Sequence, residues 1–151
     1  MRIFNHNAKP RYIGGALALA LLLSACSTTS ALELEAGNCL DLPDNAELSA
    51  GFELATVQTV ACTSEHEAEV YAEKELTSDE FPGTDAIQNI ASEFCTTEFK
   101  TFVGSEIGTS TLDIYPLMPT AESWDQAGDR TLLCVAISPT PVTNTFENSG
   151  L

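Results

Sequence analysis

The sequence predicts an α+β domain, in which a small antiparallel sheet has one long helix packed on one face and two disulfides hold the fold. Three observations predict it. Segments with strand patterns stand at both ends of the folded region, one segment with helical spacing lies between them, and four cysteines are spread over these segments. The order of strands, one helix and strands is typical of an antiparallel sheet covered by a helix.

The first 25 residues predict a secretory signal peptide. Arg2, Lys9 and Arg11 precede an apolar run at 13–23, and small residues follow it. Basic, apolar and small segments in this order are typical of export signals. The apolar run has 11 residues, whereas about 20 are needed to cross a bilayer, so we expect no permanent transmembrane helix here.

The signal ends in Leu23-Ser24-Ala25-Cys26, which resembles the lipobox of bacterial lipoproteins. The resemblance implies that the Cys26 sulfur receives a diacylglycerol and that cleavage falls before it. The alternative is a plain secretory signal with an incidental cysteine. Lipidation is favoured because removing Cys26 leaves an even number of cysteines. We therefore expect a lipid anchor in the cell membrane, on its extracytoplasmic face, with residues 26–37 as a flexible tether.

The predicted mature chain is strongly acidic. The signal carries three of the six Lys and Arg residues and none of the 22 Asp and Glu residues, so the formal charge falls from −16 to −19 when it is removed. Such a surface repels nucleic acid, and we expect no nucleic-acid partner. It also repels anionic headgroups, so the lipid must hold the protein at the membrane.

The remaining cysteines are Cys39, Cys62, Cys95 and Cys134. No pair has the C-x-x-C spacing of a zinc or redox site, so structural disulfides are predicted for an exported protein. Three pairings are possible. The layout favours Cys39–Cys62, which would clip the first strands, and Cys95–Cys134, which would join the helix to a central strand.

Two adjoining segments predict the first strands. Residues 54–62 are rich in β-branched side chains, and residues 65–76 alternate between acidic and apolar positions. Alternation with a period of two indicates a strand with one face in water. Glu69 belongs to this wet, almost wholly acidic face.

The helix is predicted after the Phe81-Pro82-Gly83 turn, with Thr84 or Asp85 as its N-cap and Gly104 at its end. Glu98 falls within its apolar arc, where a carboxylate must be paired, protonated or lifted out.

Residues 111–118 predict a strand, residues 121–126 a short helix or turn, and the apolar run 130–138 a central strand. The folded domain is thus expected at 38–138, followed by a polar, loosely held tail at 139–151.

His66 is the one histidine of the predicted mature chain and a candidate general base. On a straight strand, however, Glu67 and Glu69 point to the opposite face, and no G-x-S-x-G motif is present. A partly buried histidine, hydrogen-bonded near a strand start, is the favoured interpretation. We therefore expect no enzyme, with an envelope hydrolase using His66 as an alternative.

The acidic strand offers oxygen ligands for Ca²⁺. Its side chains project in parallel rather than converging, and no D-x-D-x-D-G loop is present. A solvated face without metal or cofactor is predicted, and Ca²⁺ binding stays an alternative.

Trp124 and Arg130 lie in the densest cluster of special residues. In one interpretation Trp124 covers the core and Arg130 pairs with a carboxylate such as Glu69 or Glu98. In the other, Trp124 is exposed and anchors an interface, since Trp and Arg dominate binding hot spots. The structural interpretation is favoured.

The order of these clusters resembles the septum formation-related domain of actinobacterial envelope proteins. The matching clusters are Gly37-x-Cys39, Cys62-x-x-x-His66-x-x-Glu69-Val70, Phe81-Pro82-Gly83, Cys95-x-x-x-Phe99-x-x-Phe102-Val103-Gly104, Ser123-Trp124 and Gly128-Asp129-Arg130-x-x-x-Cys134. The resemblance implies a membrane-tethered envelope protein linked to septum formation. We expect a binding or scaffolding module whose partner is an envelope or division protein. The candidate contacts are Trp124, Arg130, His66 and Glu69.

Overall fold

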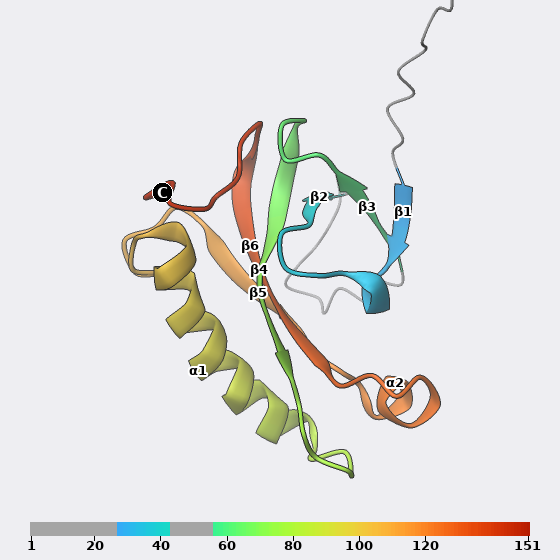
Figure 1. Ribbon diagram of the computed structural model, residues 1–151. Helices are drawn as coiled ribbons and strands as arrows, with labels where there is room; N and C mark the ends of the chain where they lie inside the picture. Colours follow the sequence, from blue (N-terminus) through green and yellow to red (C-terminus); the bar gives the residue numbers. More distant parts are fainter. Residues whose placement is uncertain (1–26, 43–55) are drawn as a thin grey trace, which may run out of the picture.

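The computed structural model describes residues 27–42 and 56–151. These residues form a six-stranded antiparallel sheet with the strand order β1-β3-β2-β4-β6-β5 (Figure 1). Its strands are β1 (Ser27–Ser30), β2 (Cys39–Asp41), β3 (Thr56–Val60), β4 (His66–Glu75), β5 (Asp113–Leu117) and β6 (Thr131–Val142). A 3₁₀ turn, η1 (Ala31–Glu33), follows β1, and the two helices are α1 (Thr84–Val103) and α2 (Ala121–Gln126). The predicted α+β class is confirmed.

Helix α1 forms where the apolar spacing predicts it. Gly83 is its N-cap, with a φ of 94°, and Gly104 ends it in the left-handed conformation with a φ of 86°. Both backbone conformations favour glycine. The helix therefore begins at Thr84, and the prediction of Thr84 or Asp85 as N-cap is wrong by one or two residues. The buried side chains recur at every fourth residue: Ile87, Ala91, Cys95, Phe99 and Val103.

Apolar side chains cover both faces of the central strands. On one face, Tyr71 and Cys134 pack with Phe99 of α1 and with Phe146 near the C-terminus. On the other face, residues of the β1–β3–β2 side of the sheet pack over β4 and β6: Leu34, Leu40 and Val57 contact a cluster with Val70, Leu133, Val135 and Ile137. Strand β6 pairs with both β4 and β5, as a central strand should.

The prediction that one face of β4 is in water is wrong for the middle of the strand. The pairing of β4 with β6 shifts register between His66 and Ala68 and again between Val70 and Ala72. The second shift breaks the alternation, because the consecutive residues Tyr71 and Ala72 both belong to the cluster that packs on α1. Glu69 stands opposite Ala136 of the same cluster, and α1 and the C-terminal segment cover this face. Glu69 is therefore 3% exposed and Tyr71 is 7% exposed. The strand is exposed only in its last three residues, Glu73–Glu75.

Both predicted ends of the domain also need correction. Within the expected tether, β1 pairs with β3 and Leu34 is buried. In the expected tail, β6 continues to Val142, Phe146 is fully buried, and Gly150 donates its N–H to Val103 O. The domain therefore extends over 27–151 in the described ranges. Cys26 and the signal peptide lie outside the described residues.

The structure contains both predicted disulfides. Cys39–Cys62 joins β2 to the turn after β3, with Cα atoms 5.3 Å apart, and Cys95–Cys134 joins α1 to β6, with Cα atoms 5.4 Å apart. Each closes a loop whose entropy in the unfolded chain is worth about 3–4 kcal/mol. The second one ties the helix to the sheet at the centre of the core.

Tyr71 makes the stability of this core dependent on pH. Its hydroxyl donates to Cys95 O at 2.7 Å, and its ring packs edge-on against Phe99. Burial raises the pKa of Tyr71 above its ordinary value, and the charge of Glu98 on α1 raises it further. In the unfolded chain a tyrosine loses its proton at a pH of about 10, so above that pH deprotonation favours the unfolded state.

We therefore expect stability to fall above about pH 10, by up to about 1.4 kcal/mol per pH unit from this residue. The variant Tyr71→Phe loses one hydrogen bond and should be about 1 kcal/mol less stable at pH 8. Its stability should fall less steeply on further alkalinisation. Urea denaturation from pH 8 to pH 11 measures both effects. Parallel pH profiles for the two proteins would show that Tyr71 does not titrate on unfolding.

Candidate functional site

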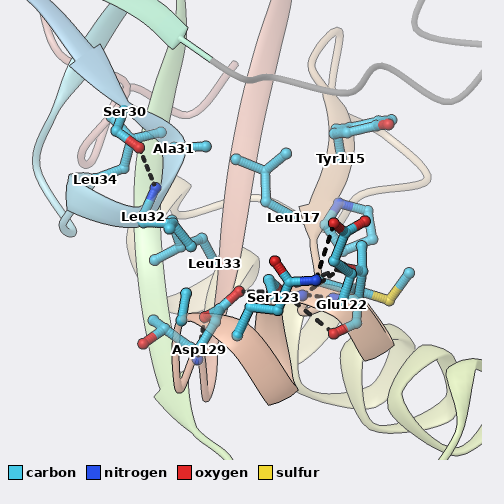
Figure 2. A pocket seen from close by; sticks show the side chains of 16 residues that line it. Ser30, Ala31, Leu32, Leu34, Tyr115, Leu117, Glu122, Ser123, Asp129 and Leu133 are labelled. Atoms are coloured by element: carbon cyan, nitrogen blue, oxygen red, sulfur yellow. Dashed lines mark hydrogen bonds between the residues drawn. The ribbon is translucent and has the colours of Figure 1, made fainter.

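The candidate site is an apolar groove between η1, the paired strands β5 and β6, and α2, with a volume of about 730 Å³. Figure 2 shows Leu32 and Leu34 on one side, Tyr115 and Leu117 on the other, and Leu133 of β6 between them. Leu32 is 58% exposed, more than any other large apolar side chain of the described residues. The groove thus offers apolar surface that the described residues do not cover.

Strand pairing explains how the wall of this groove is built. Leu117 of β5 stands opposite Leu133 of β6, and Leu133 stands opposite Glu73 of β4. Directly opposed residues on neighbouring strands project to the same face of a sheet. One row across three strands therefore carries two leucines and then a carboxylate.

Helix α2 closes one end of the groove and is held by short polar contacts. Thr120 caps it, and the hydroxyl of Thr120 accepts from Ser123 N at 3.0 Å. Ser123 Oγ donates to Asp129 Oδ2 at 2.9 Å, and the other oxygen of Asp129 accepts from Thr131 N at 3.1 Å. These bonds fix the turn between α2 and β6, so Glu122 and Asp129 stand at a defined place beside the groove (Figure 2).

Trp124 and Arg130 support α2 from the inner side. The Arg130 guanidinium lies 3.7 Å from the Trp124 ring centroid and donates to Trp124 O and Asp129 O, each at 3.0 Å. Trp124 is 2% exposed and packs edge-on against Phe81. The interpretation of Trp124 as a core residue is confirmed, and the one that made it an exposed anchor is wrong. The predicted pairing of Arg130 with Glu69 or Glu98 is also wrong. The Arg130 guanidinium instead donates to two backbone carbonyls and stacks on the indole ring.

Carboxylates surround the open end of the groove. A second hollow of about 400 Å³ shares Leu32, Asp129 and Thr131 with the groove and is also lined by Glu73 and Glu75. Among the described residues the salt bridge found is Lys100–Glu106, which contributes to neither hollow. The carboxylates around the groove therefore have no ion-pair partner in the described part of the chain.

His66 lies in the core, away from the groove. It is fully buried, and its Nδ1 is 2.9 Å from Ser64 O. Its ring packs against the Phe146 ring, with the two centroids 5.7 Å apart. Its Nε2 has no hydrogen-bond partner among the described residues. This is the predicted buried histidine near a strand start. Among the described residues, no hydrogen bond joins His66 to an acid or a hydroxyl, as a hydrolase using His66 would require.

Glu69 is a buried carboxylate that fastens the C-terminal segment. It accepts from Thr145 Oγ1 and from Phe146 N, each at 2.7 Å. Both donors lie in the segment that was predicted to be a loose tail. Glu69 is therefore a structural residue in the core rather than part of a contact surface.

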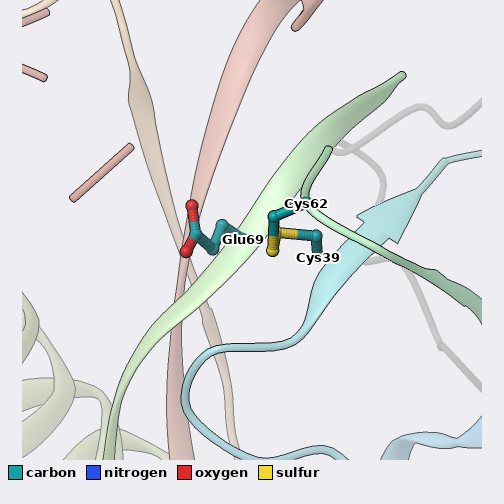
Figure 3. A group of neighbouring side chains, drawn as sticks. All are labelled: Cys39, Cys62 and Glu69. Carbon is teal, nitrogen blue, oxygen red and sulfur yellow. A yellow bond between two sulfur atoms is a disulfide. The ribbon is translucent and has the colours of Figure 1, made fainter. Parts of the chain in front are cut away.

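One cluster combines residue types that can bind metals: Cys39, Cys62 and Glu69, whose ligand atoms lie within 4.8 Å of one another (Figure 3). Both sulfurs are joined in a disulfide, so neither is available as a thiolate, and both oxygens of Glu69 already accept hydrogen bonds. This donor set does not fit a metal ion. Two of the other three β4 carboxylates have separate partners, since Glu67 accepts from Leu42 N and Glu73 from Ala36 N.

Fold and groove together define a small, acidic, disulfide-bonded α+β domain. Residues 36–151 match the septum formation family, and the chain belongs to that family. This is not a known enzyme family.

Two curated relatives come from Mycobacterium tuberculosis: "Uncharacterized membrane protein MT3943" of strain CDC 1551 and "Uncharacterized membrane protein Rv3835" of strain H37Rv. Each is 31% identical over 117 residues, which cover 70% of this chain and 24% of the relative. The chain thus spans about a quarter of the length of these relatives. No solved structure matches the chain. Within the described residues, neither helix combines the length and apolar character needed to cross a membrane.

The groove residues were missed in the sequence because three distant segments supply them. A local signal existed in Leu32-Glu33-Leu34, where two leucines interrupt a segment interpreted as a tether. Leu34 turns inward and Leu32 stays exposed.

The variant Arg130→Met tests whether Arg130 holds α2 and thereby the groove wall. It keeps most of the aliphatic stem but loses both carbonyl hydrogen bonds and the cation–π contact, which should lower the free energy of unfolding by about 1–3 kcal/mol. The matched control is Lys100→Met, which removes an exposed cation from α1 and should change stability little. Chemical denaturation measures both. Equal stability of the two variants would contradict the role assigned to Arg130.

Proposed function

We propose that this protein is a lipid-anchored, extracytoplasmic binding module of the cell envelope, without enzymatic activity, and that its apolar groove receives a partner protein of septum formation. The observation that carries the proposal is the open groove beside an N-terminal strand that begins immediately after the lipobox cysteine.

The N-terminal sequence supports the anchor and brings it close to the groove. The signal ends in a lipobox-like sequence at Cys26, and β1 begins at the next residue, Ser27. Strand residues advance about 3.3 Å each, so the five steps from Cys26 to Ala31, the first residue of η1, span at most about 17 Å. Two acyl chains bind a bilayer stably, whereas one binds marginally. A diacylated Cys26 would therefore keep the groove close to the membrane surface.

The place of action is inferred from the family. Its description is septum formation, and the two mycobacterial relatives are named as membrane proteins. Those relatives are about four times as long as the matched region. The partner and the activity proposed here therefore concern this chain and not the whole length of those relatives.

Binding is favoured over catalysis because of what lines the groove. Leucines and Tyr115 form its wall, and burial of such apolar surface in a complex is worth about 25 cal/mol per Å². The histidine that could serve as a general base lies elsewhere, in the core.

Cys26→Ser tests the anchor. In cells fed an alkyne-tagged fatty acid, the unaltered protein should be labelled and should sediment with membranes. Cys26→Ser should lose the label and leave the membrane fraction, because no acyl chain remains. The control is Leu32→Asn, which alters the groove only and should remain labelled. A Cys26→Ser protein that stays labelled and membrane-bound would contradict the anchor.

Site-specific photocrosslinking in cells tests the binding role. A photoreactive amino acid at Leu32 in the groove should capture a small, reproducible set of division or wall-synthesis proteins. The matched control places the same amino acid at Ile90, a partly exposed residue of α1 that does not line the groove. The same adducts at both positions, or no protein adduct at Leu32, would contradict a partner in the groove.

A further inference from the structure

We infer that the groove binds an extended peptide segment of its partner that carries both apolar and basic side chains. This inference rests on the proposed function and names the chemistry of the partner. The apolar groove and the adjoining hollow are together called the acidic groove below.

The two hollows form one continuous surface of mixed character. They share Leu32, Ala127, Asp129 and Thr131. The apolar part is lined by leucines from η1, β5 and β6, and the other part by carboxylates from β4 and from the turn before β6. A ligand that fills the acidic groove must therefore match both chemistries.

The charge favours a cationic ligand. Glu73, Glu75, Glu122 and Asp129 line the acidic groove, and Arg130 is the one cation lining it in the described part of the chain. The formal charge of this lining is thus −3. The Arg130 guanidinium stacks on Trp124 and does not form a salt bridge with these carboxylates. An anionic ligand would be repelled, whereas a Lys or Arg side chain would gain a partner.

The geometry of the sheet favours an extended peptide. Strand β5 is an edge strand that pairs only with β6 in the described residues, and β1 is the edge at the other end. Both edges contribute to the groove, β5 through Tyr115 and Leu117 and β1 through Ser30. An edge strand presents backbone donors and acceptors that an added strand can pair with. Pro116 lacks an N–H, which limits how fully such a strand can pair with β5.

The spacing of the carboxylates suits alternating side chains. Glu73 and Glu75 lie two residues apart on β4 and stand opposite Leu133 and Thr131 of β6. Residues two apart on a strand share one face and are separated by about 7 Å. An extended peptide has the same repeat, so basic residues at every second position can meet both carboxylates.

The test is a selection from a random decapeptide library displayed on phage, with the full-length protein held in detergent. Selected peptides should be enriched in Lys and Arg interspersed with Leu, Val, Ile or aromatic residues. The affinity of synthesised winners is then measured by fluorescence anisotropy. Leu32→Asn should weaken their binding about tenfold or more, which corresponds to at least about 1.4 kcal/mol.

Matched charge variants separate a site from general attraction to an acidic protein. Glu75→Gln combined with Glu122→Gln removes two charges at the acidic groove and should weaken binding about tenfold. The control combines Glu93→Gln with Glu147→Gln, two exposed residues outside the acidic groove, and removes the same charge. This control should retain binding within about twofold.

Several outcomes would overturn the inference. They are selection of acidic or purely apolar peptides, failure to select any peptide, or equal weakening by the two double variants. None of them removes the proposed function, because crosslinking at Leu32 reports separately whether a protein occupies the groove. Displacement of selected peptides by a fatty acid, with no protein crosslink at Leu32, would instead point to an acyl chain as the occupant and would overturn both.

Discussion

The antiparallel pairing of β4 with β6 is the constraint on which the rest of the structure depends. Both strands carry apolar side chains on both faces, and a sheet of this kind is stable only when each face is covered. Helix α1 covers one face and is joined to β6 by Cys95–Cys134, while the β2–β3 side covers the other. Glu69 fits into this pair because Thr145 and Phe146 bring two donors to its carboxylate. The C-terminal segment is thereby made part of the core.

The acidic groove follows from the way in which the second face is covered. Leu34 and Leu40 pack over the middle of β4 and β6, but η1 and α2 leave a space beside Leu117. Helix α2 has only six residues, too few to be stable alone. It keeps its place through Trp124 in the core and Arg130 stacked on the indole ring. Trp124 and Arg130 thus support α2, and Arg130 also lines the acidic groove.

His66 and Glu69, which were also singled out for their chemistry, have structural roles as well. In a chain with so few cations and one histidine after its predicted signal, each rare side chain is conspicuous in the sequence. The structure uses His66, Glu69, Trp124 and Arg130 to satisfy buried backbone groups and to fill the core. Leu32 and Leu117, which line the groove, are ordinary residue types, and only their position makes them notable.

The sequence by itself determined the fold class, the long helix, most strands and the membership of the septum formation family, and it favoured the disulfide pairing that the structure contains. These features depend on local signals such as apolar periodicity, glycine at helix ends and the order of the cysteines. Only the tertiary structure decided that Glu69 and Tyr71 point inward, that the C-terminal segment is folded, and that a groove opens beside α2. Contacts between distant segments decide all three, since α1 and the C-terminal segment cover the face of β4 that carries Glu69 and Tyr71. A pattern within one segment does not contain that information.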